Sequence, residues 1–276
     1  MKPGRSVNKS LFFILLSSIS SVLFSQSQIK TPVFIPYVGQ PGKDVIWVPT
    51  PPELVDKMLD LADVSEKDFL IDLGSGDGRT VIAAAKLGAK ALGIEFNPDM
   101  VELSKKKAEE AGVSNKTNFV VADLFGYDLS EATVITMFLL PDINLRLRPH
   151  LLDLRPGTRI VSNTFTMGEW QPDFEEMAEG NWDTWFTALM WIIPAKVEGI
   201  WNIGSRILTL YQEFQMVYGT LKTGENISNI TEGRLKGNEI TFSANGATYT
   251  GRVSGKRNMS GTVISKAGKS NWSAVR

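Results

Sequence analysis

The segment Asp72-Leu-Gly-Ser-Gly-Asp-Gly-Arg79 constrains the fold of this chain more than any other part of its 276 residues. It follows a short apolar run, Phe69–Leu73, that is typical of a buried strand, and it leads into an Ala-rich stretch, Arg79–Lys86, that favours a helix. Glycines in such a turn adopt backbone conformations closed to other residues and let a ligand approach the main chain. The helix N-terminus behind the turn attracts a carboxylate or a phosphate. The segment therefore predicts a ligand site between a strand and a helix.

The alternation of strands and helices continues along the chain. Further strands are predicted at Ala91–Ile94, Asn118–Ala122, Thr133–Phe138 and Thr158–Ser162, and further helices at 98–111 and Asn144–Leu154. Strands that alternate with helices form a parallel sheet with helices on both faces, so an α/β fold is predicted.

Acidic residues stand at the ends of the second and third predicted strands. Glu95 closes Ala91–Ile94, and Asp123 follows the third strand. Open α/β sheets bind ligands at the carboxyl ends of their strands, so these acids and the glycine turn are expected to share one site. A carboxylate at Glu95 can accept hydrogen bonds from both hydroxyls of a ribose. A dinucleotide fold requires G-x-G-x-x-G, but Arg79 stands where its third glycine would fall, so that match fails.

The chain instead fits acid-x-Gly-x-Gly-x-Gly, which resembles motif I of class I S-adenosylmethionine-dependent methyltransferases. The resemblance implies a Rossmann-like class I methyltransferase sheet, S-adenosyl-L-methionine as the cofactor, and binding of the adenine amino group by Asp123. Thr50, between Pro49 and Pro51, is expected to bond the methionine end of the cofactor. The cofactor-binding residues expected are Thr50, Asp72, Gly74, Ser75, Gly76, Asp77, Gly78, Glu95, Phe96, Asp123 and Leu124.

Segments on both sides of motif I indicate a smaller group within the class I methyltransferases. Trp47-Val-Pro-Thr-Pro51, Leu154–Ser162 and Gly168–Pro172 are together similar to a group of lysine methyltransferases. That group includes archaeal broad-specificity enzymes and the mitochondrial enzyme acting on the ATP synthase c-subunit, and it has bacterial relatives with a signal-like N-terminus. Trp47 replaces the tyrosine usual in the group. The resemblance implies protein-lysine N-methylation by in-line SN2 transfer, with a protein lysine as the acceptor.

A lysine must be neutral before it can accept a methyl group. With a pKa of ~10.4, its deprotonation at pH 7 costs roughly 4–5 kcal/mol, and an apolar, aromatic slot lowers that cost. The residues expected to line such a slot are Trp47, Phe138, Leu139 and Trp170.

Two alternatives stay open: a methyltransferase acting on a small molecule or a lipid, and a non-catalytic scaffold whose C-terminal part is a binding module. DNA amino-methyltransferases carry Asp/Asn-Pro-Pro-Tyr/Phe after the fourth strand, whereas this chain has Leu139-Leu-Pro-Asp142, which argues against base methylation. A formal net charge of −1 also argues against binding nucleic acid by bulk electrostatics. With no cysteine and one histidine, Cys-ligated and multi-His metal sites are excluded, and no metal is predicted.

The helical pattern ends near Pro194. Segments at Val197–Trp201, Leu208–Tyr218, Glu239–Ser243, Ala247–Val253 and Gly261–Ser265 predict a small antiparallel β module, a sandwich or a barrel. From Lys222 to Arg276 the chain has nine Lys and Arg against three Glu. This basic stretch is either a solvated β face or a surface for an acidic partner or a membrane.

Residues 1–25 carry three basic residues and then an apolar stretch that is shorter than the ~20 residues of a membrane span. They predict a signal peptide cleaved after Ser25, and hence an exported or envelope-associated protein. The alternative is an uncleaved membrane anchor with the enzyme in the cytoplasm. The remaining divisions predicted are a lead-in segment at 26–52, a methyltransferase domain at 53–194 and a β-rich module at 195–276.

Overall fold

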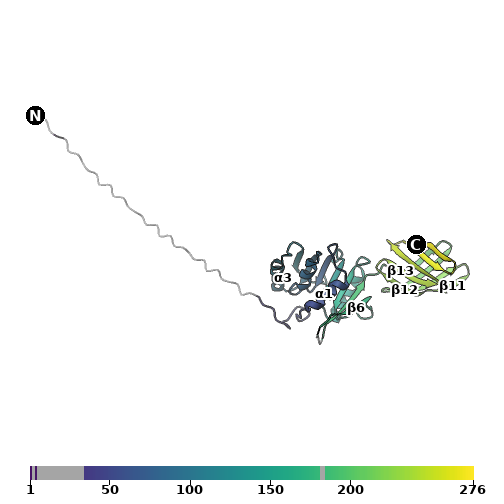
Figure 1. Ribbon diagram of the computed structural model, residues 1–276, viewed down its shortest axis with the longest axis horizontal. Helices are drawn as coiled ribbons and strands as arrows, with labels where there is room; N and C mark the ends of the chain where they lie inside the picture. Colours follow the sequence, from purple (N-terminus) through teal and green to yellow (C-terminus); the bar gives the residue numbers. More distant parts are fainter. Residues whose placement is uncertain (2–3, 5–33, 181–183) are drawn as a thin grey trace. The chain divides into compact units, whose positions relative to one another are not determined.

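Seven strands form the first sheet of the structure, a computed structural model that describes residues 34–180 and 184–276 together with Met1 and Gly4 (Figure 1). The strand order is β3-β2-β1-β4-β5-β7-β6. Its strands are β1 (Phe69–Leu73), β2 (Lys90–Glu95), β3 (Thr117–Val121), β4 (Val134–Met137), β5 (Arg159–Asn163), β6 (Phe174–Met177) and β7 (Thr187–Ile192). β1 to β5 are parallel, which confirms the predicted Rossmann-like order. The predicted signal peptide lies outside the described residues, apart from Met1 and Gly4.

The sequence analysis does not predict the two strands at one edge of this sheet, β7 and β6. β7 runs antiparallel to β5, with Arg159 opposite Ile192, and β6 runs antiparallel to β7. A parallel neighbour for β5 would require a crossover connection, which is usually a helix. The described residues between β5 and β7 contain no helix, so the chain reverses direction there.

The helices of the described chain all belong to the part that forms this sheet: α1 (Pro52–Leu61), α2 (Arg79–Lys86), α3 (Pro98–Glu110) and α4 (Pro141–Leu152). α2 and α3 lie where the sequence predicts them, and the Asn97 side chain caps α3 by accepting a hydrogen bond from the Asp99 amide (2.9 Å). α4 begins at Pro141 rather than at Asn144, because proline suits the first turn of a helix.

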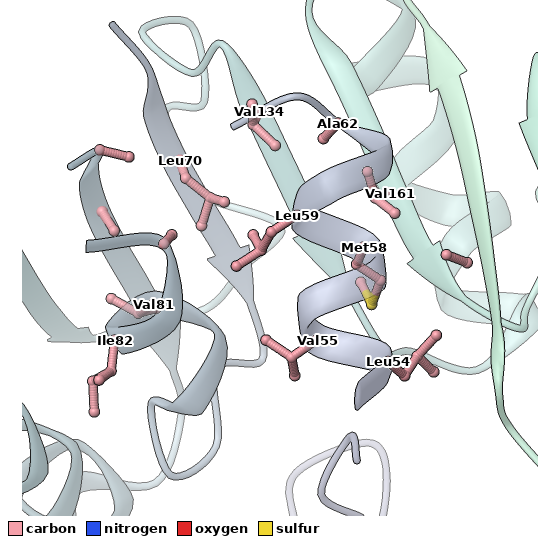
Figure 2. Close-up of a cluster of buried hydrophobic side chains, with 14 of the residues drawn as sticks. Leu54, Val55, Met58, Leu59, Ala62, Leu70, Val81, Ile82, Val134 and Val161 are labelled. Atoms are coloured by element: carbon pink, nitrogen blue, oxygen red, sulfur yellow. The ribbon is translucent and has the colours of Figure 1, made fainter. Parts of the chain in front are cut away.

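α1 is a helix that the sequence analysis does not predict, because the prolines at its start are typical of an irregular segment. It buries four apolar residues on one face: Leu54, Val55, Met58 and Leu59. Figure 2 shows this face against strands β1, β4 and β5, from which Leu70, Val134 and Val161 contribute to the same core. Packing of α1 fixes the end of the lead-in segment, Thr50-Pro51, directly before the helix.

The remaining strands form a second, antiparallel sheet with the order β11-β10-β12-β13-β14-β15-β16-β8-β9. An additional pairing of β9 with β10 closes this sheet into a barrel, which confirms the predicted antiparallel module. Its strands are β8 (Gly199–Ile203), β9 (Arg206–Glu213), β10 (Met216–Thr223), β11 (Asn226–Asn229), β12 (Thr231–Lys236), β13 (Glu239–Ala244), β14 (Ala247–Ser254), β15 (Asn258–Ser265) and β16 (Gly268–Val275).

The barrel differs from the prediction in its hairpins. The single segment expected at Leu208–Tyr218 is two strands, β9 and β10, joined by a turn at Phe214-Gln215 in which Phe214 has a φ of 50°. Strands β11, β12 and β16 are not predicted, because their outward positions are polar. Phe242 stacks on Tyr249 inside the barrel, at 4.6 Å between ring centroids.

Residues 34–276 form one compact unit that holds both sheets. In the described part of the chain, no helix combines the length and the apolar character that crossing a membrane requires.

Candidate active site

A pocket opens at the carboxyl ends of β1, β2 and β4, beside the loop that follows β3. The lead-in segment Gln40–Thr50 covers one side of it, and the glycine turn forms its base. Every residue predicted to bind cofactor or acceptor lines this pocket except Gly78 and Trp170. The sequence therefore located the pocket, while the role of each residue stays a prediction.

The glycine turn brings the main chain against the lead-in segment. Gly76 has a φ of 53°, and a Cβ at this position would lie 2.6 Å from Trp47 Nε1, so no other residue fits. Gly78 precedes α2 with a φ of 78°, and a Cβ there would lie 2.8 Å from Ser104 and Phe119. Gly78 therefore permits close packing behind the turn, while its binding of the cofactor stays a prediction.

Asp72 is a buried carboxyl group at the end of β1. Thr136 of β4 donates a hydrogen bond to its Oδ1 (2.7 Å). Burial raises the pKa of Asp72 from 3.8 to about 7, although the hydrogen bond from Thr136 lowers it, and the nearby carboxylates of Glu95 and Asp77 raise it further. The group is thus poised to lose its proton when a positive charge enters the pocket.

Glu95 is held by backbone amides at the end of β2. Its Oε2 accepts from Gly76, and its Oε1 accepts from Phe96 and Asn97, each at 2.9 Å. These bonds orient the carboxylate, and they leave Oε2 a further acceptor site for a ligand, whereas Oε1 already accepts two hydrogen bonds.

Asp77 is neutralised within the protein. Arg79 donates to both of its oxygens (2.9 Å each), and Lys107 donates to Oδ2 (2.6 Å). Burial raises the pKa of Asp77, but these two cations outweigh burial and hold it below its ordinary value. Arg79 also donates to the Thr50 carbonyl (2.8 Å), so this cluster ties the lead-in segment to the glycine turn.

Asp123 is paired with a lysine that the sequence analysis does not identify. Lys43 Nζ lies 2.6 Å from Asp123 Oδ2 and 4.8 Å from the centroid of the Phe96 ring. The hydrogen bond from Lys43 holds the pKa of Asp123 below its usual value, and a bond from the Phe125 amide adds to this effect. The group at the predicted adenine position is therefore already bound to a cation.

Aromatic rings line the other end of the pocket. Phe138 stacks on Phe165, with centroids 5.8 Å apart, and meets Trp185 edge-on at 5.9 Å. These three residues form the aromatic slot, and Leu139 is buried next to it. Phe165 and Trp185 are missed by the sequence analysis, because they lie in irregular segments with no motif. The backbone is strained at both places, because Thr164, directly before Phe165, has a φ of 58° and Trp185 itself has a φ of 60°.

The structure contradicts the prediction for Trp170. Its indole is fully buried outside the pocket, stacks on Phe214 at 5.7 Å, and donates from Nε1 to Gln215 Oε1 (2.9 Å). A buried indole N–H needs an acceptor, and the barrel supplies one.

The pocket fits a ligand with both polar and apolar parts. The Oγ of Ser75, on the glycine turn, is buried towards Gly93 and has no hydrogen-bond partner among the described residues. Carboxylates at one end of the pocket and aromatic rings at the other match the ribose and methyl groups of S-adenosylmethionine. Across residues 34–180 and 184–276, no group of three or more Asp, Glu and His side chains could hold a metal ion.

Comparison with known proteins also indicates a methyltransferase. A family model described as the ANTKMT methyltransferase domain matches residues 72–174. A protein-lysine N-methyltransferase of Saccharolobus islandicus is 43% identical over 141 residues, covering 50% of this chain and 88% of that protein. A lysine N-methyltransferase of Mus musculus, named for the ATP synthase c-subunit, is 32% identical over 170 residues, covering 58% of this chain and 64% of that protein.

One solved structure is also similar over this region. It is a crystal structure of an RNA methyltransferase from Salinibacter ruber in complex with S-adenosyl-L-homocysteine. It is 51% identical, with a TM-score of 0.51, and the match covers 54% of this chain and 96% of that chain.

Proposed function

The chain belongs to the ANTKMT-type family of S-adenosylmethionine-dependent methyltransferases, and from this premise we propose that it methylates the side-chain amine of lysine in a protein. The aromatic slot is the observation that carries the proposal. Its three rings lie at one end of a pocket whose other residues suit the cofactor. The archaeal relative at 43% identity is named a protein-lysine N-methyltransferase, which supports the same acceptor.

S-adenosylmethionine supplies an electrophilic methyl group when it is bound. Glu95 would accept a hydrogen bond from a ribose hydroxyl at Oε2, the carboxylate oxygen that accepts only one bond within the protein. Asp123 would accept the adenine amino group after releasing Lys43. Asp72 and Thr50 would hold the methionine end, where the ionised form of Asp72 balances the ammonium group.

The aromatic slot would prepare the lysine. Aromatic faces attract an ammonium group as it enters, and exclusion of water lowers the pKa of the amine, which favours its neutral, nucleophilic form. Phe138, Phe165 and Trp185 have no titratable group, so the proton would leave to solvent rather than to a protein base. Alignment and desolvation are therefore the contributions of these residues to the reaction.

RNA is the second candidate acceptor, because the Salinibacter ruber structure is described as an RNA methyltransferase. Two observations favour protein. Residues 26–194 contain 15 Lys and Arg against 25 Asp and Glu, and such an excess of negative charge opposes binding of a phosphate backbone. The pocket rim also presents three exposed apolar side chains, Ile46, Leu140 and Trp185, which suit an apolar stretch of polypeptide.

The test supplies tritium-labelled S-adenosylmethionine to the purified chain with protein and RNA fractions of the source organism in separate reactions. We expect methyllysine in protein, identified by mass spectrometry, and no label with Glu95→Ala. Phe165→Ala should lower the rate by about tenfold or more, since alignment is lost. Phe174→Ala, which changes an exposed phenylalanine of β6 outside the pocket, is the matched control. Label in RNA alone, or only in a small molecule or lipid, would overturn the lysine proposal.

A further inference from the structure

We propose that the β9–β10 turn of the barrel positions the acceptor end of the pocket, with Gln215 as the positioning residue. The proposal gives the C-terminal barrel a part in methyl transfer. It rests on the proposed function only for the identity of the acceptor, because the contacts involved belong to the pocket whatever the acceptor is.

The turn holds the segment 167–171 by three contacts. Trp170 Nε1 donates to Gln215 Oε1 (2.9 Å), Gln215 Nε2 donates to the Gln171 carbonyl (2.8 Å), and Phe214 stacks on Trp170 with an interplanar angle of 12°. Trp170 and Gln215 are both buried. Trp191 of β7 donates to the Trp170 carbonyl (2.8 Å), so the segment is fixed from the sheet as well.

The same segment leads back to Phe165 of the aromatic slot. Met167 and Trp170 form an antiparallel bridge, which closes a short loop that begins two residues after Phe165. Asn144 of α4 donates to the carbonyls of Phe165 and Thr166 (3.2 Å each). Trp170 lies only five residues after Phe165 in the chain. A displacement of Trp170 would therefore also displace Phe165.

Arg148 of α4 provides a second connection. It donates to the Met167 carbonyl (2.8 Å), and its guanidinium lies 5.4 Å from the centroid of the Phe214 ring. The barrel turn thus contacts both Trp170 and the arginine that holds Met167. Two independent contacts from one turn fix both ends of the Met167–Trp170 bridge.

Strained backbone makes this support necessary. Thr164, directly before Phe165, has a φ of 58°, a conformation that non-glycine residues keep only where their surroundings hold them. Without Gln215, the buried Trp170 indole N–H and the Gln171 carbonyl would lose their partners, and the loop would move to recover hydrogen bonds. Phe165 would then leave its stacking position on Phe138.

The experiment compares Gln215→Leu with Trp272→Phe in the full chain. Leucine removes both hydrogen bonds of Gln215. Trp272→Phe removes bonds that stay within the barrel, to the carbonyls of Thr250 and Thr262, and so controls for loss of barrel stability. Hydrogen exchange of peptides covering 163–171 and 72–79 reports on the loop and on the glycine turn. Steady-state kinetics and calorimetry give the acceptor KM, kcat and the Kd of S-adenosylmethionine.

We expect Gln215→Leu to speed exchange in 163–171 only, and to raise the acceptor KM roughly tenfold, because small misplacements of a slot have large kinetic effects. The Kd of S-adenosylmethionine should not change, and Trp272→Phe should alter neither the loop nor KM. Equal loop exchange in both variants would overturn the proposal. If no lysine is methylated by the wild-type chain, the proposed function fails, while the exchange comparison still decides the role of Gln215.

Discussion

Replacing Asp72 by Asn removes a buried charge from the base of the pocket while preserving its shape. The Asn Oδ1 can still accept the hydrogen bond from Thr136. In the wild-type protein, burial and the nearby carboxylates of Glu95 and Asp77 raise the pKa of Asp72 to about 7. The substitution should therefore stabilise the cofactor-free protein at neutral and alkaline pH.

The sign follows from proton linkage. Between pH 3.8 and about 7, the Asp72 carboxyl is ionised in the unfolded chain and protonated in the folded chain. Stability due to this group is complete below the lower value, falls as pH rises through this window, and is constant above it. The difference between 3.8 and about 7 corresponds to roughly 4 kcal/mol. Asp72→Asn should gain up to that amount above about pH 7, and nothing near pH 4.

The assay is urea unfolding of both proteins without cofactor at several pH values. Thr136→Val removes the bond that lowers the pKa of Asp72 in the folded chain, so it should raise the upper limit of the window and leave the lower limit unchanged. A stability difference that does not change with pH would refute the reasoning, because it would show that Asp72 keeps an ordinary pKa. The stabilised variant should also bind S-adenosylmethionine more weakly, since the carboxylate that balances the methionine ammonium is gone.

Three further predictions concern the pocket and the N-terminus. Glu95→Gln replaces one of the carboxylate oxygens that three backbone amides hold by an NH2 group, which cannot accept. The substitution should raise the Kd of S-adenosylmethionine about tenfold or more in calorimetry, a loss of roughly 1.4 kcal/mol; an unchanged Kd would contradict the role of Glu95. Lys43→Ala frees the Asp123 carboxylate and should strengthen cofactor binding at low salt but not at high salt, because salt screens an exposed ion pair. Weaker binding at both salt concentrations would mean that Lys43 itself contacts the cofactor. We further expect the chain to be exported and cleaved after Ser25, which N-terminal sequencing of the mature protein checks; an intact Met1 would indicate an anchor.

The barrel distinguishes this chain from the archaeal relative. The archaeal lysine methyltransferase is matched over 88% of its length by half of this chain, so it has no room for nine further strands. In this chain the buried Trp170 depends on Gln215 of that barrel for its hydrogen bond. The loop beside the aromatic slot therefore depends on a contact with the C-terminal barrel.

The cofactor end of the pocket could be predicted because its determinants are local. The glycine turn adjoins its own strand and helix, and Glu95 and Asp123 follow the next two strands. Parallel strands bring their carboxyl ends to one edge, so strand order along the chain was enough to place these groups together. The change from a strand pattern to a helix pattern along the sequence likewise predicted the positions of α2 and α3.

The acceptor end was decided by tertiary structure. Phe165 and Trp185 reach Phe138 from irregular segments. At the cofactor end, the pairing of Lys43 with Asp123 across 80 residues of sequence has the same long-range origin. No local pattern encodes such contacts, because they depend on packing between elements distant in the chain. Trp170 shows the reverse case: its motif pointed to the slot, but its indole N–H found an acceptor in the barrel. Local conformational preferences thus determined where the cofactor pocket forms, and long-range packing of side chains decided what surrounds the acceptor.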